Sequence, residues 1–433
     1  MVSQTRRELL VSTGAGTAGL MGLSGCLQGF GGSSEDELLL GIASWSGGRW
    51  DFLQPPLTKT WRIAVNDIND ADGGGPLGGE LEGKERSTKN DPTEARTVLE
   101  QFKETDEAVA VTNITSPVTV ALWDFLLDLE MPINAQAGTT FKDKRGGDNN
   151  TPDDLSDDEW IWRTIPGDLP VFAATSKYLL GEGIETMGIL HGTDQDPITW
   201  AEGFENIFEA AGGTVSKTVE FQEGQSTYRS ILDRFFNNAD FDGWAVTGPF
   251  DDVVTIIEQW DEAGYGRQLL IDNGIGGPDM IDAVGDTAEG AWQPAASLNG
   301  PNFDQYVQRF QNADLMTDVT DTNRWGTATY DWVHIAALAI ERAGESSHDA
   351  IQQNIGPVAR PGGTEVASFQ EGKEELDNGN EINYQGAGSR CNFTGNGNVI
   401  GSAQVDRVTP GGYETLREYS ESDFQDIIGE VEY

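Results

Sequence analysis

The stretch "EAVAVTNITSPVTVALWDFLLDLE", residues 107–130, changes its hydrophobic pattern halfway along. Residues 107–114 form a short, nearly continuous apolar run, which is typical of a strand that is buried on both faces. Residues 116–130 begin with Ser and Pro and then repeat apolar residues at helical spacing. The stretch therefore predicts a buried strand, a short loop and a helix.

The same order recurs along the chain. Residues 38–44, "LLLGIAS", precede a helical pattern at residues 57–70, and strand-like runs at 185–192, 242–248 and 267–273 each precede another helical pattern. Apolar strands that alternate with helices indicate parallel sheets covered on both faces. Because a chain of 433 residues is too long for one small core, we predict an α/β fold with two doubly wound parallel-sheet lobes.

The composition is strongly acidic, with 72 Asp and Glu against 27 Lys and Arg and a formal net charge of -45. Nucleic acid is excluded as a partner, because phosphate binding requires basic side chains at the surface. The acids are spread along the whole chain, a pattern typical of halophilic proteins. At about 1 M salt the Debye length is about 3 Å, so selectivity must come from short, partly buried contacts.

The first 26 residues have the layout of an export signal. Arg6 and Arg7 form a twin-arginine segment, residues 9–23 are weakly apolar, and small residues precede Cys26. Residues 23–26 resemble a lipobox, which implies a lipid on Cys26 and a flexible tether over residues 27–37. The alternative is a cleaved twin-arginine signal with an incidental cysteine. The apolar run is too short and glycine-rich to span a membrane.

Three further features have no assigned function. If Cys26 carries a lipid, Cys391 has no partner for an intramolecular disulfide, and we expect it to be a small, partly buried residue. The acidic, glycine-containing insertions at residues 142–159 and 362–381 are poor in apolar residues. We expect both insertions to be solvated surface loops.

Several phrases, in order, match a known family. They include "WRIAVNDINDADGGG" (61–75), "KNDPTEARTVLEQF" (89–102), "MPINAQAGTT" (131–140), "WIWRTIPGD" (160–168) and "ATYDWVHIAALAIERAG" (328–344). Over roughly residues 38–407 the chain resembles type I periplasmic-binding-protein-like receptors of the branched-chain amino acid class, the solute-binding components of ABC importers.

The resemblance implies a two-lobe clamp with three crossovers between its lobes. Lobe one would comprise residues 38–166 plus 292–361, and lobe two residues 167–291 plus 362–433. The solute would lie in the cleft between the lobes, and closure would bury it.

The solute-binding residues of lobe one are expected in three loops at strand carboxyl ends, where ligands bind in parallel sheets. Thr115, Ser116, Gly138 and Thr139 offer O–H and N–H donors for an α-carboxylate, and simple helix capping is the alternative role. The family uses these loops for its ligand. The candidates in the three loops are Ser46, Trp50, Thr115, Ser116, Ala137, Gly138 and Thr139.

Lobe two is expected to supply an anion for an α-ammonium group. In the family an acidic residue just after a lobe-two strand has this role, and Asp272 stands at or one position from that place. Trp50 and Phe250 are expected to flank the solute's side chain, with ordinary packing as the alternative. Asp196 and Pro197 replace a Tyr-Gly pair that is usual in the amino acid receptors. The additional carboxylate of Asp196 favours a cationic or amine-bearing solute.

The sequence carries no signature of an enzyme. H-E-x-x-H, P-loop, EF-hand and cysteine-based metal motifs are missing, and the three histidines, at 191, 334 and 348, form no triad with a serine. We expect no catalytic residue, cofactor or metal.

The expected function is that of a monomeric lipoprotein on the outer face of the cell membrane. It would bind an amino acid or a related small polar solute and deliver it to an ABC permease driven by an ATPase. Two alternatives remain open: a ligand-sensing lipoprotein for signalling, and a urea or short-amide receptor of the same fold.

Overall fold

The computed structural model describes residues 37–48, 50–143, 145, 159–297, 300–320 and 322–429. The export signal, Cys26 and all but the last residue of the expected tether lie outside these residues. Among the described residues, no helix combines the length and apolar character that crossing a membrane requires.

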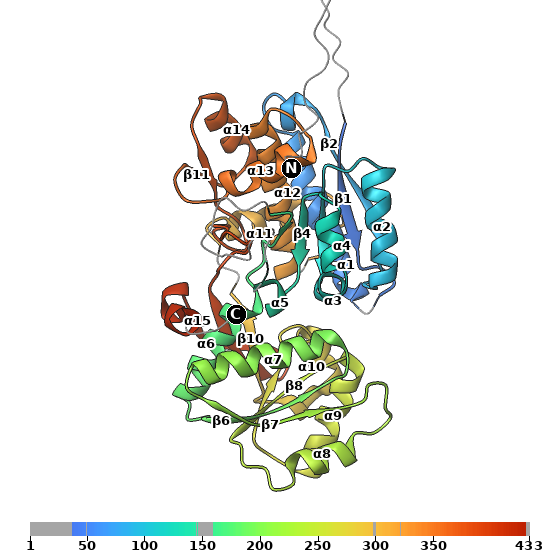
Figure 1. Cartoon of the computed structure of the whole chain (residues 1–433), viewed down its shortest axis with the longest axis vertical. Helices are drawn as coiled ribbons and strands as arrows, with labels where there is room; N and C mark the ends of the chain where they lie inside the picture. The colour runs from blue at the N-terminus through green and yellow to red at the C-terminus, as the bar shows by residue number, and fades with distance from the viewer. Residues whose placement is uncertain are drawn as a thin grey trace, which may run out of the picture. The chain divides into compact units, whose positions relative to one another are not determined.

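The first sheet is entirely parallel, as the sequence predicted, and has the strand order β2-β1-β3-β4-β5. Its strands β1, β2 and β4 are labelled in Figure 1. The apolar run of residues 107–114 corresponds to the central strand β3. The strands in chain order are β1 (Leu38–Ser44), β2 (Leu81–Ser87), β3 (Ala110–Thr115), β4 (Ile133–Gln136) and β5 (Ile161–Trp162).

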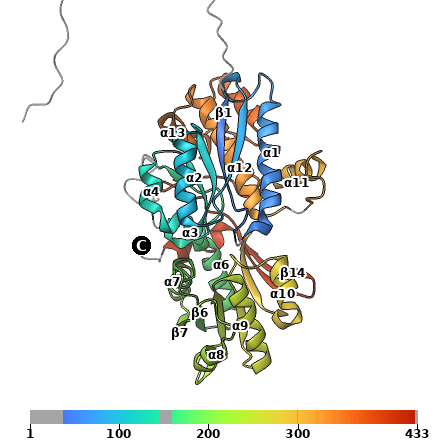
Figure 2. The same ribbon diagram turned by 90° about the vertical axis from the view of Figure 1, so that its right-hand side faces the viewer.

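Helices cover both faces of this sheet (Figure 2). Leu40 and Ile42 of β1 join a core with helices α1 (Gln54–Asn69), α12 (Arg324–Ala343) and α13 (His348–Val358). Ala43, on the opposite face, joins a second core. The helices on that side are α2 (Pro92–Glu104), α3 (Ser116–Ala121) and α4 (Trp123–Asp128). The side-chain alternation along β1 therefore feeds two separate hydrophobic layers.

The second sheet has the strand order β14-β13-β10-β9-β8-β6-β7. Its five strands from β10 to β7 are parallel, which again agrees with the prediction. The strands are β6 (Thr186–His191), β7 (Thr214–Glu220), β8 (Gly243–Thr247), β9 (Gln268–Ile271), β10 (Trp292–Ala296), β13 (Ala403–Thr409) and β14 (Gly412–Tyr419).

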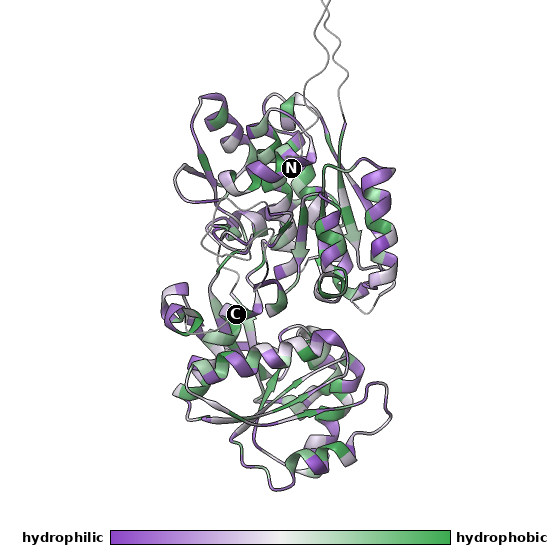
Figure 3. Cartoon of the chain, viewed as in Figure 1, coloured by the Kyte–Doolittle hydropathy of each residue, from purple (hydrophilic) through white to green (hydrophobic). Residues whose placement is uncertain are grey.

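Two helical layers also enclose the second sheet. Ile189 of β6 packs toward α6 (Asp168–Gly181), α7 (Gln195–Ala210) and α15 (Gln425–Gly429). Leu190 packs toward α8 (Arg229–Phe236), α9 (Phe250–Ala263) and α10 (Pro278–Val284). In Figure 3 the strands are mainly apolar, whereas the helices combine apolar and hydrophilic residues, as expected for helices between a sheet and water.

The carboxy-terminal edge of the second sheet was not predicted. β13 runs antiparallel to both β10 and β14, and β13 and β14 are joined at a turn in which Gly411 has a positive φ of 83°. A hairpin of this kind adds an antiparallel edge to an otherwise parallel sheet.

Over the described residues the chain passes three times between the two lobes, but two of the crossings lie elsewhere than expected. Trp292–Ala296 belongs to the second sheet as β10, because it pairs with β9 and β13. Residues up to Val399 contribute to the hydrophobic core around α12, whereas Ala403 contributes to the core around α6. We therefore assign the described residues within 37–166 and 300–399 to the first lobe and those within 167–297 and 400–429 to the second lobe.

The insertion at residues 362–381 is not a solvated loop. It forms β11 (Thr364–Val366) and α14 (Phe369–Asp377), followed by β12 (Ile382–Tyr384). Val366 and Phe369 are 3% and 1% exposed in the core of the first lobe. Burial of these two apolar side chains is favourable, and it holds the segment against α12. The remaining helices are α5 (Thr140–Asp143) and α11 (Phe303–Asn312).

The ends of the insertion at residues 142–159 also depart from the expectation of a solvated loop. Lys142 and Glu159 are both 0% exposed and form an ion pair with an N–O distance of 3.5 Å. Each charge tolerates burial because the other is its partner.

Cys391 lies deeper than expected, at 0% exposure in the first lobe. Burial raises the pKa of its thiol well above the ordinary value. In a chain that begins after Cys26, we predict that a thiol-reactive dye leaves Cys391 unmodified in the native state and modifies it once denaturant unfolds the first lobe, because only the accessible thiolate reacts. Rapid labelling of the native protein would contradict this packing.

Candidate functional site

Two adjoining pockets lie where loops of the two lobes meet. They share four lining residues: Trp50 from the first lobe, and Asp196, Asp272 and Gly274 from the second. The first pocket is also lined by Phe52, Pro197, Thr247, Gly248, Phe250 and Ile275. The second pocket is also lined by Ser116, Gly138, Thr139, Asp168, Trp200, Asn273, Arg324 and Trp325.

The first lobe presents small polar groups to the second pocket. Ser116 is the first residue of α3 and follows β3 directly. Gly138 and Thr139 follow β4, the neighbouring strand in the sheet. These three residues lie together because parallel strands end at the same edge of their sheet. They were predicted to be ligand-binding residues, and the pocket geometry is consistent with that role.

Tryptophans form the aromatic wall of the first lobe. The ring of Trp45 lies 5.8 Å from that of Trp50 and 5.7 Å from that of Trp325. Trp45 is itself fixed, because its Nε1 donates a hydrogen bond of 2.8 Å to the carbonyl oxygen of Asn113. Trp50 and Trp325 therefore rest on a buried, hydrogen-bonded tryptophan and present their remaining surface to the pockets.

Asp272 is the acidic centre of the second lobe. It follows β9 and accepts hydrogen bonds from the hydroxyl of Thr247, at 2.7 Å, and from the backbone N–H of Gly274, at 2.6 Å. Burial raises the pKa of the Asp272 carboxyl to about 6, and the nearby charge of Asp196 also raises it. The two hydrogen bonds oppose this shift because they favour the carboxylate.

Asp196 and Phe250 enter the first pocket from two helices of the second lobe. Asp196 lies in the first turn of α7, and Phe250 is the first residue of α9. Both side chains are half-buried. Asp196 adds a second carboxylate to the lining beside that of Asp272, while Phe250 adds apolar surface.

Asn273 connects three residues that the sequence analysis missed. Its Oδ1 accepts a hydrogen bond of 3.1 Å from Trp200 Nε1, and its Nδ2 donates one of 3.1 Å to Asp168 Oδ1. The guanidinium of Arg324 donates to its backbone carbonyl. Asp168 and Asn273 belong to the second lobe and Arg324 to the first, so this cluster joins the lobes beside the second pocket.

Burial shifts the pKa values of the ionisable groups in this cluster. Burial raises the pKa of the Asp168 carboxyl to about 7, and the charge of Asp272 adds to the increase. Burial also lowers the pKa of Arg324, although Asp168 and Asp272 favour its charged form. Its guanidinium lies 4.8 Å from the ring centre of Trp325, a cation-π contact.

Only weak sequence signals could have revealed these additional residues. Asp168 ends the phrase "WIWRTIPGD" directly after a lobe crossing, so its place at the interface could have been inferred. The place of Arg324 at the interface could not have been inferred, because its contact with Asn273 joins positions 51 residues apart in the sequence.

Three predicted residues do not line either pocket. Thr115 is buried, and its hydroxyl donates to Asn90. The carbonyl oxygen of Ala137 accepts from the guanidinium of Arg163 at 3.0 Å. Ser46 turns toward its own strand, since its hydroxyl accepts a hydrogen bond of 3.0 Å from Ser44.

Within the described part of the chain, no group of three or more His, Cys, Asp and Glu side chains has a metal-binding arrangement. The pockets instead combine hydroxyl and backbone donors, aromatic surface, one guanidinium and three carboxyl groups. This set suits a small polar solute with both an anionic and a cationic group.

The comparisons with known proteins agree with the fold. A family model described as "Periplasmic binding protein" matches residues 41–358. No curated protein matches the chain in sequence.

Solved structures resemble the chain at low sequence identity. The leucine-binding protein LivK of Thermotoga maritima superimposes with a TM-score of 0.70 at 18% identity, over 89% of this chain and 99% of its own. LivJ of Streptococcus pneumoniae, in complex with isoleucine, gives 0.66 at 16% over 89% and 99%. An ABC transporter solute-binding protein of R. palustris, in complex with 4-hydroxybenzoate, gives 0.65 at 16% over 90% and 98%. At these identities the likeness concerns the fold.

The family match covers most of the chain, and the two-lobe α/β architecture is the type I periplasmic binding protein fold. The chain belongs to the periplasmic binding protein family, whose members are solute-binding proteins and not enzymes.

Proposed function

We propose that the protein is the receptor of an ABC import system and binds an amino acid or a related small polar solute between its lobes. The observation that carries the proposal is the polarity of the second pocket. Hydrogen-bond donors of the first lobe, at Ser116 and Thr139, line it together with the buried acid Asp272 of the second lobe. A zwitterion has the complementary charges, so one solute engages both lobes.

The carboxylate of the solute is bound on the first-lobe side. The hydroxyl of Ser116 and the loop at Gly138 and Thr139 provide hydrogen-bond donors. Arg324 adds a charged donor, and hydrogen bonds between charged groups are about twice as strong as neutral ones.

The ammonium group is bound by Asp272. Thr247 and Gly274 already orient its carboxylate, so little reorganisation is needed when the solute arrives. The aromatic side chains of Trp50 and Phe250 bury the rest of the solute. A few such contacts are consistent with micromolar affinity, which corresponds to about -8 kcal/mol.

The pockets favour a solute with a second cationic group. Their ionisable lining residues are Asp168, Asp196, Asp272 and Arg324, three acids against one base. A neutral amino acid leaves this negative excess unchanged, whereas a basic amino acid reduces it. Aromatic neighbours also stabilise cations. Basic amino acids are therefore the preferred class within the proposal, and amine-bearing amides are the next.

Delivery follows from the two-lobe architecture. A solute that contacts both lobes shifts the population toward a closed clamp, and the closed form docks on a membrane permease whose ATPase drives uptake. In this proposal a lipid on Cys26 keeps the monomeric receptor at the outer face of the membrane.

The first prediction concerns solute class. In a thermal-shift screen of the signal-free chain in molar salt, basic amino acids are expected to raise the Tm most, because only a binding-competent native state gains free energy from the solute. The panel includes leucine, amides, urea and small carboxylates. Stabilisation by leucine without any by basic amino acids or amides would contradict the preference for a cation, and no response to any amino acid would contradict the proposed function.

The second prediction concerns Asp272. Asp272→Asn removes the anion that pairs with the solute ammonium, and the expected loss is about 2 to 4 kcal/mol, or roughly 30-fold to 1,000-fold in Kd. Asp252→Asn is the matched control, since Asp252 is equally buried in the second lobe and accepts from Gly224 N–H and the Tyr228 hydroxyl. Isothermal titration should find the control unchanged. Equal affinity of both variants would exclude the assigned role.

The third prediction concerns pH. Because burial raises the pKa of Asp272 to about 6, its carboxyl is mostly ionised at pH 7 and mostly protonated at pH 5. Only the carboxylate pairs with an ammonium group, so the Kd is expected to rise about tenfold from pH 7 to pH 5. Asp272→Asn should weaken this dependence. A Kd that falls from pH 7 to pH 5 would show that the assigned charge pairing is wrong.

A further inference from the structure

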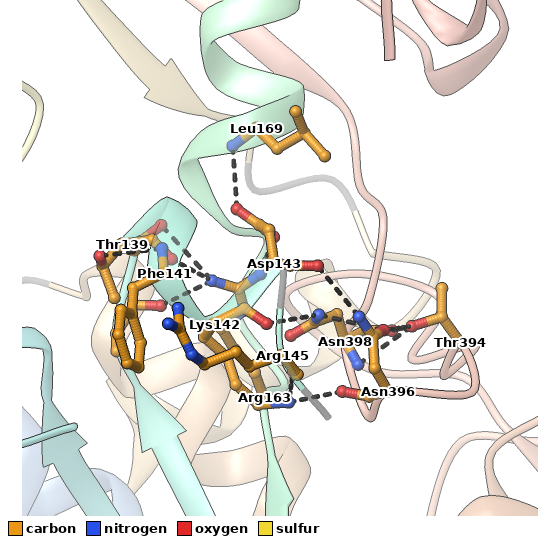
Figure 4. Close-up of polar contacts among 12 residues, drawn as sticks. Thr139, Phe141, Lys142, Asp143, Arg145, Arg163, Leu169, Thr394, Asn396 and Asn398 are labelled. Carbon is orange, nitrogen blue, oxygen red and sulfur yellow. Dashed lines mark hydrogen bonds and ion pairs between the residues drawn. The ribbon is translucent and has the colours of Figure 1, made fainter. Parts of the chain in front are cut away.

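The guanidinium of Arg163 binds the backbone of a pocket loop, on the side that faces the protein interior. It follows β5 and is 0% exposed. Its Nη1 donates to three successive carbonyl oxygens in the loop after β4: those of Ala137 at 3.0 Å, Gly138 at 3.4 Å and Thr139 at 3.2 Å (Figure 4). One charged group thus gathers three peptide carbonyls on the side of the loop that faces the protein interior.

This arrangement sets the direction of the loop's N–H groups. In a trans peptide the C=O of one residue and the N–H of the next point in opposite directions. The N–H groups of Gly138 and Thr139 therefore point away from the guanidinium. No described residue accepts a hydrogen bond from either N–H, and both residues line the second pocket. Two adjacent backbone donors of this kind suit a carboxylate oxygen.

An ion pair fixes the guanidinium in place. Its Nη2 pairs with the carboxylate of Asp143, which is 7% exposed. The other oxygen of Asp143 accepts from the N–H of Leu169 at 3.3 Å, and the N–H of Asp168 donates to the carbonyl of Gly138 at 2.6 Å. The loop is therefore connected to the start of α6 in the second lobe.

Further buried groups support the same pair. Asn396 Nδ2 donates to the backbone carbonyl of Asp143 at 3.0 Å, and Asn398 Nδ2 donates to that of Lys142 at 3.2 Å (Figure 4). Space for the guanidinium depends on Gly167, where a Cβ atom would lie 2.2 Å from Arg163 Nη2. The surroundings thus admit the planar guanidinium in one position.

We propose that Arg163 is a positioning residue for solute binding: it never contacts the solute, and it aligns the Gly138 and Thr139 N–H groups that receive the solute's carboxylate. The alignment requires arginine, because lysine presents one nitrogen and cannot bind three carbonyls and a carboxylate in a fixed plane. The role in binding rests on the proposed function, whereas the alignment of the loop does not.

The test compares Arg163→Lys with Arg360→Lys. Arg360 also lies in the first lobe and donates to two backbone carbonyls, those of Phe393 at 3.1 Å and Thr394 at 3.1 Å, but it lines neither pocket. Isothermal titration uses two probe pairs that differ by a carboxylate, L-lysine with cadaverine and L-leucine with isopentylamine. Arg163→Lys is expected to weaken binding of the amino acid at least about tenfold and that of its amine less than about threefold, a difference that one lost charge-assisted contact explains. Arg360→Lys should weaken neither.

Equal affinity of Arg163→Lys and the wild type for the amino acid would overturn the proposal, and so would equal losses for amino acid and amine, which a general loss of structure produces. If Arg163→Lys fails to fold, Arg163→Met combined with Asp143→Asn, which removes both charges, takes its place with the same expected results.

A second measurement needs no solute. NMR relaxation of the Gly138 and Thr139 amides should give rigid-backbone order parameters, near 0.85, in the wild type and Arg360→Lys, and values below about 0.6 in Arg163→Lys. Unchanged order parameters would overturn the alignment. If the wild type binds neither L-lysine nor L-leucine, the titration is repeated with the amino acid that gives the largest thermal shift and its decarboxylated amine. If no amino acid binds, the proposed function fails, and the relaxation result still decides whether Arg163 holds the loop.

Discussion

Parallel strands end at one edge of their sheet, and this constraint places the polar pocket residues that follow strands in each lobe. In the first lobe it brings Ser116, after β3, next to Gly138 and Thr139, after β4. In the second it brings Asp272, after β9, next to Thr247, which ends β8. Two such edges meet at the pockets, so a solute can contact both sheets without any long or specialised loop.

Charge in the pockets is the second organising factor. Asp168 and Asp272 are buried beside Arg324, and Asn273 joins them across the lobes. Behind the first-lobe loop, Arg163 and Asp143 form a separate buried pair. The Arg163–Asp143 pair has no net charge and a structural role, whereas the pockets have more acidic than basic side chains. Burial of an uncompensated charge is costly, and this cost is the physical basis of the proposed preference for a cationic solute.

The sequence predicted the parts of this arrangement that depend on local pattern. Alternating apolar strands and helices were enough for the two parallel sheets, and the strand-end rule located Ser116, Gly138, Thr139 and Asp272. Contacts between distant segments were not predictable. Arg324 reaches Asn273 from another lobe, and Val366 and Phe369 anchor a segment whose acidic composition suggested a solvated loop. The lobe boundaries were misplaced for the same reason, since strand pairing decides them.

The central claim is that one solute bridges the two lobes with its ammonium group on Asp272 and its carboxylate on the loop at Gly138 and Thr139. A crystal structure grown in molar salt with the amino acid that gives the largest thermal shift tests it most directly. The account predicts the solute nitrogen about 3 Å from an Asp272 carboxylate oxygen and the solute carboxylate at hydrogen-bond distance from the Gly138 and Thr139 N–H groups. A solute bound in the reverse orientation, or outside these two pockets, would contradict it.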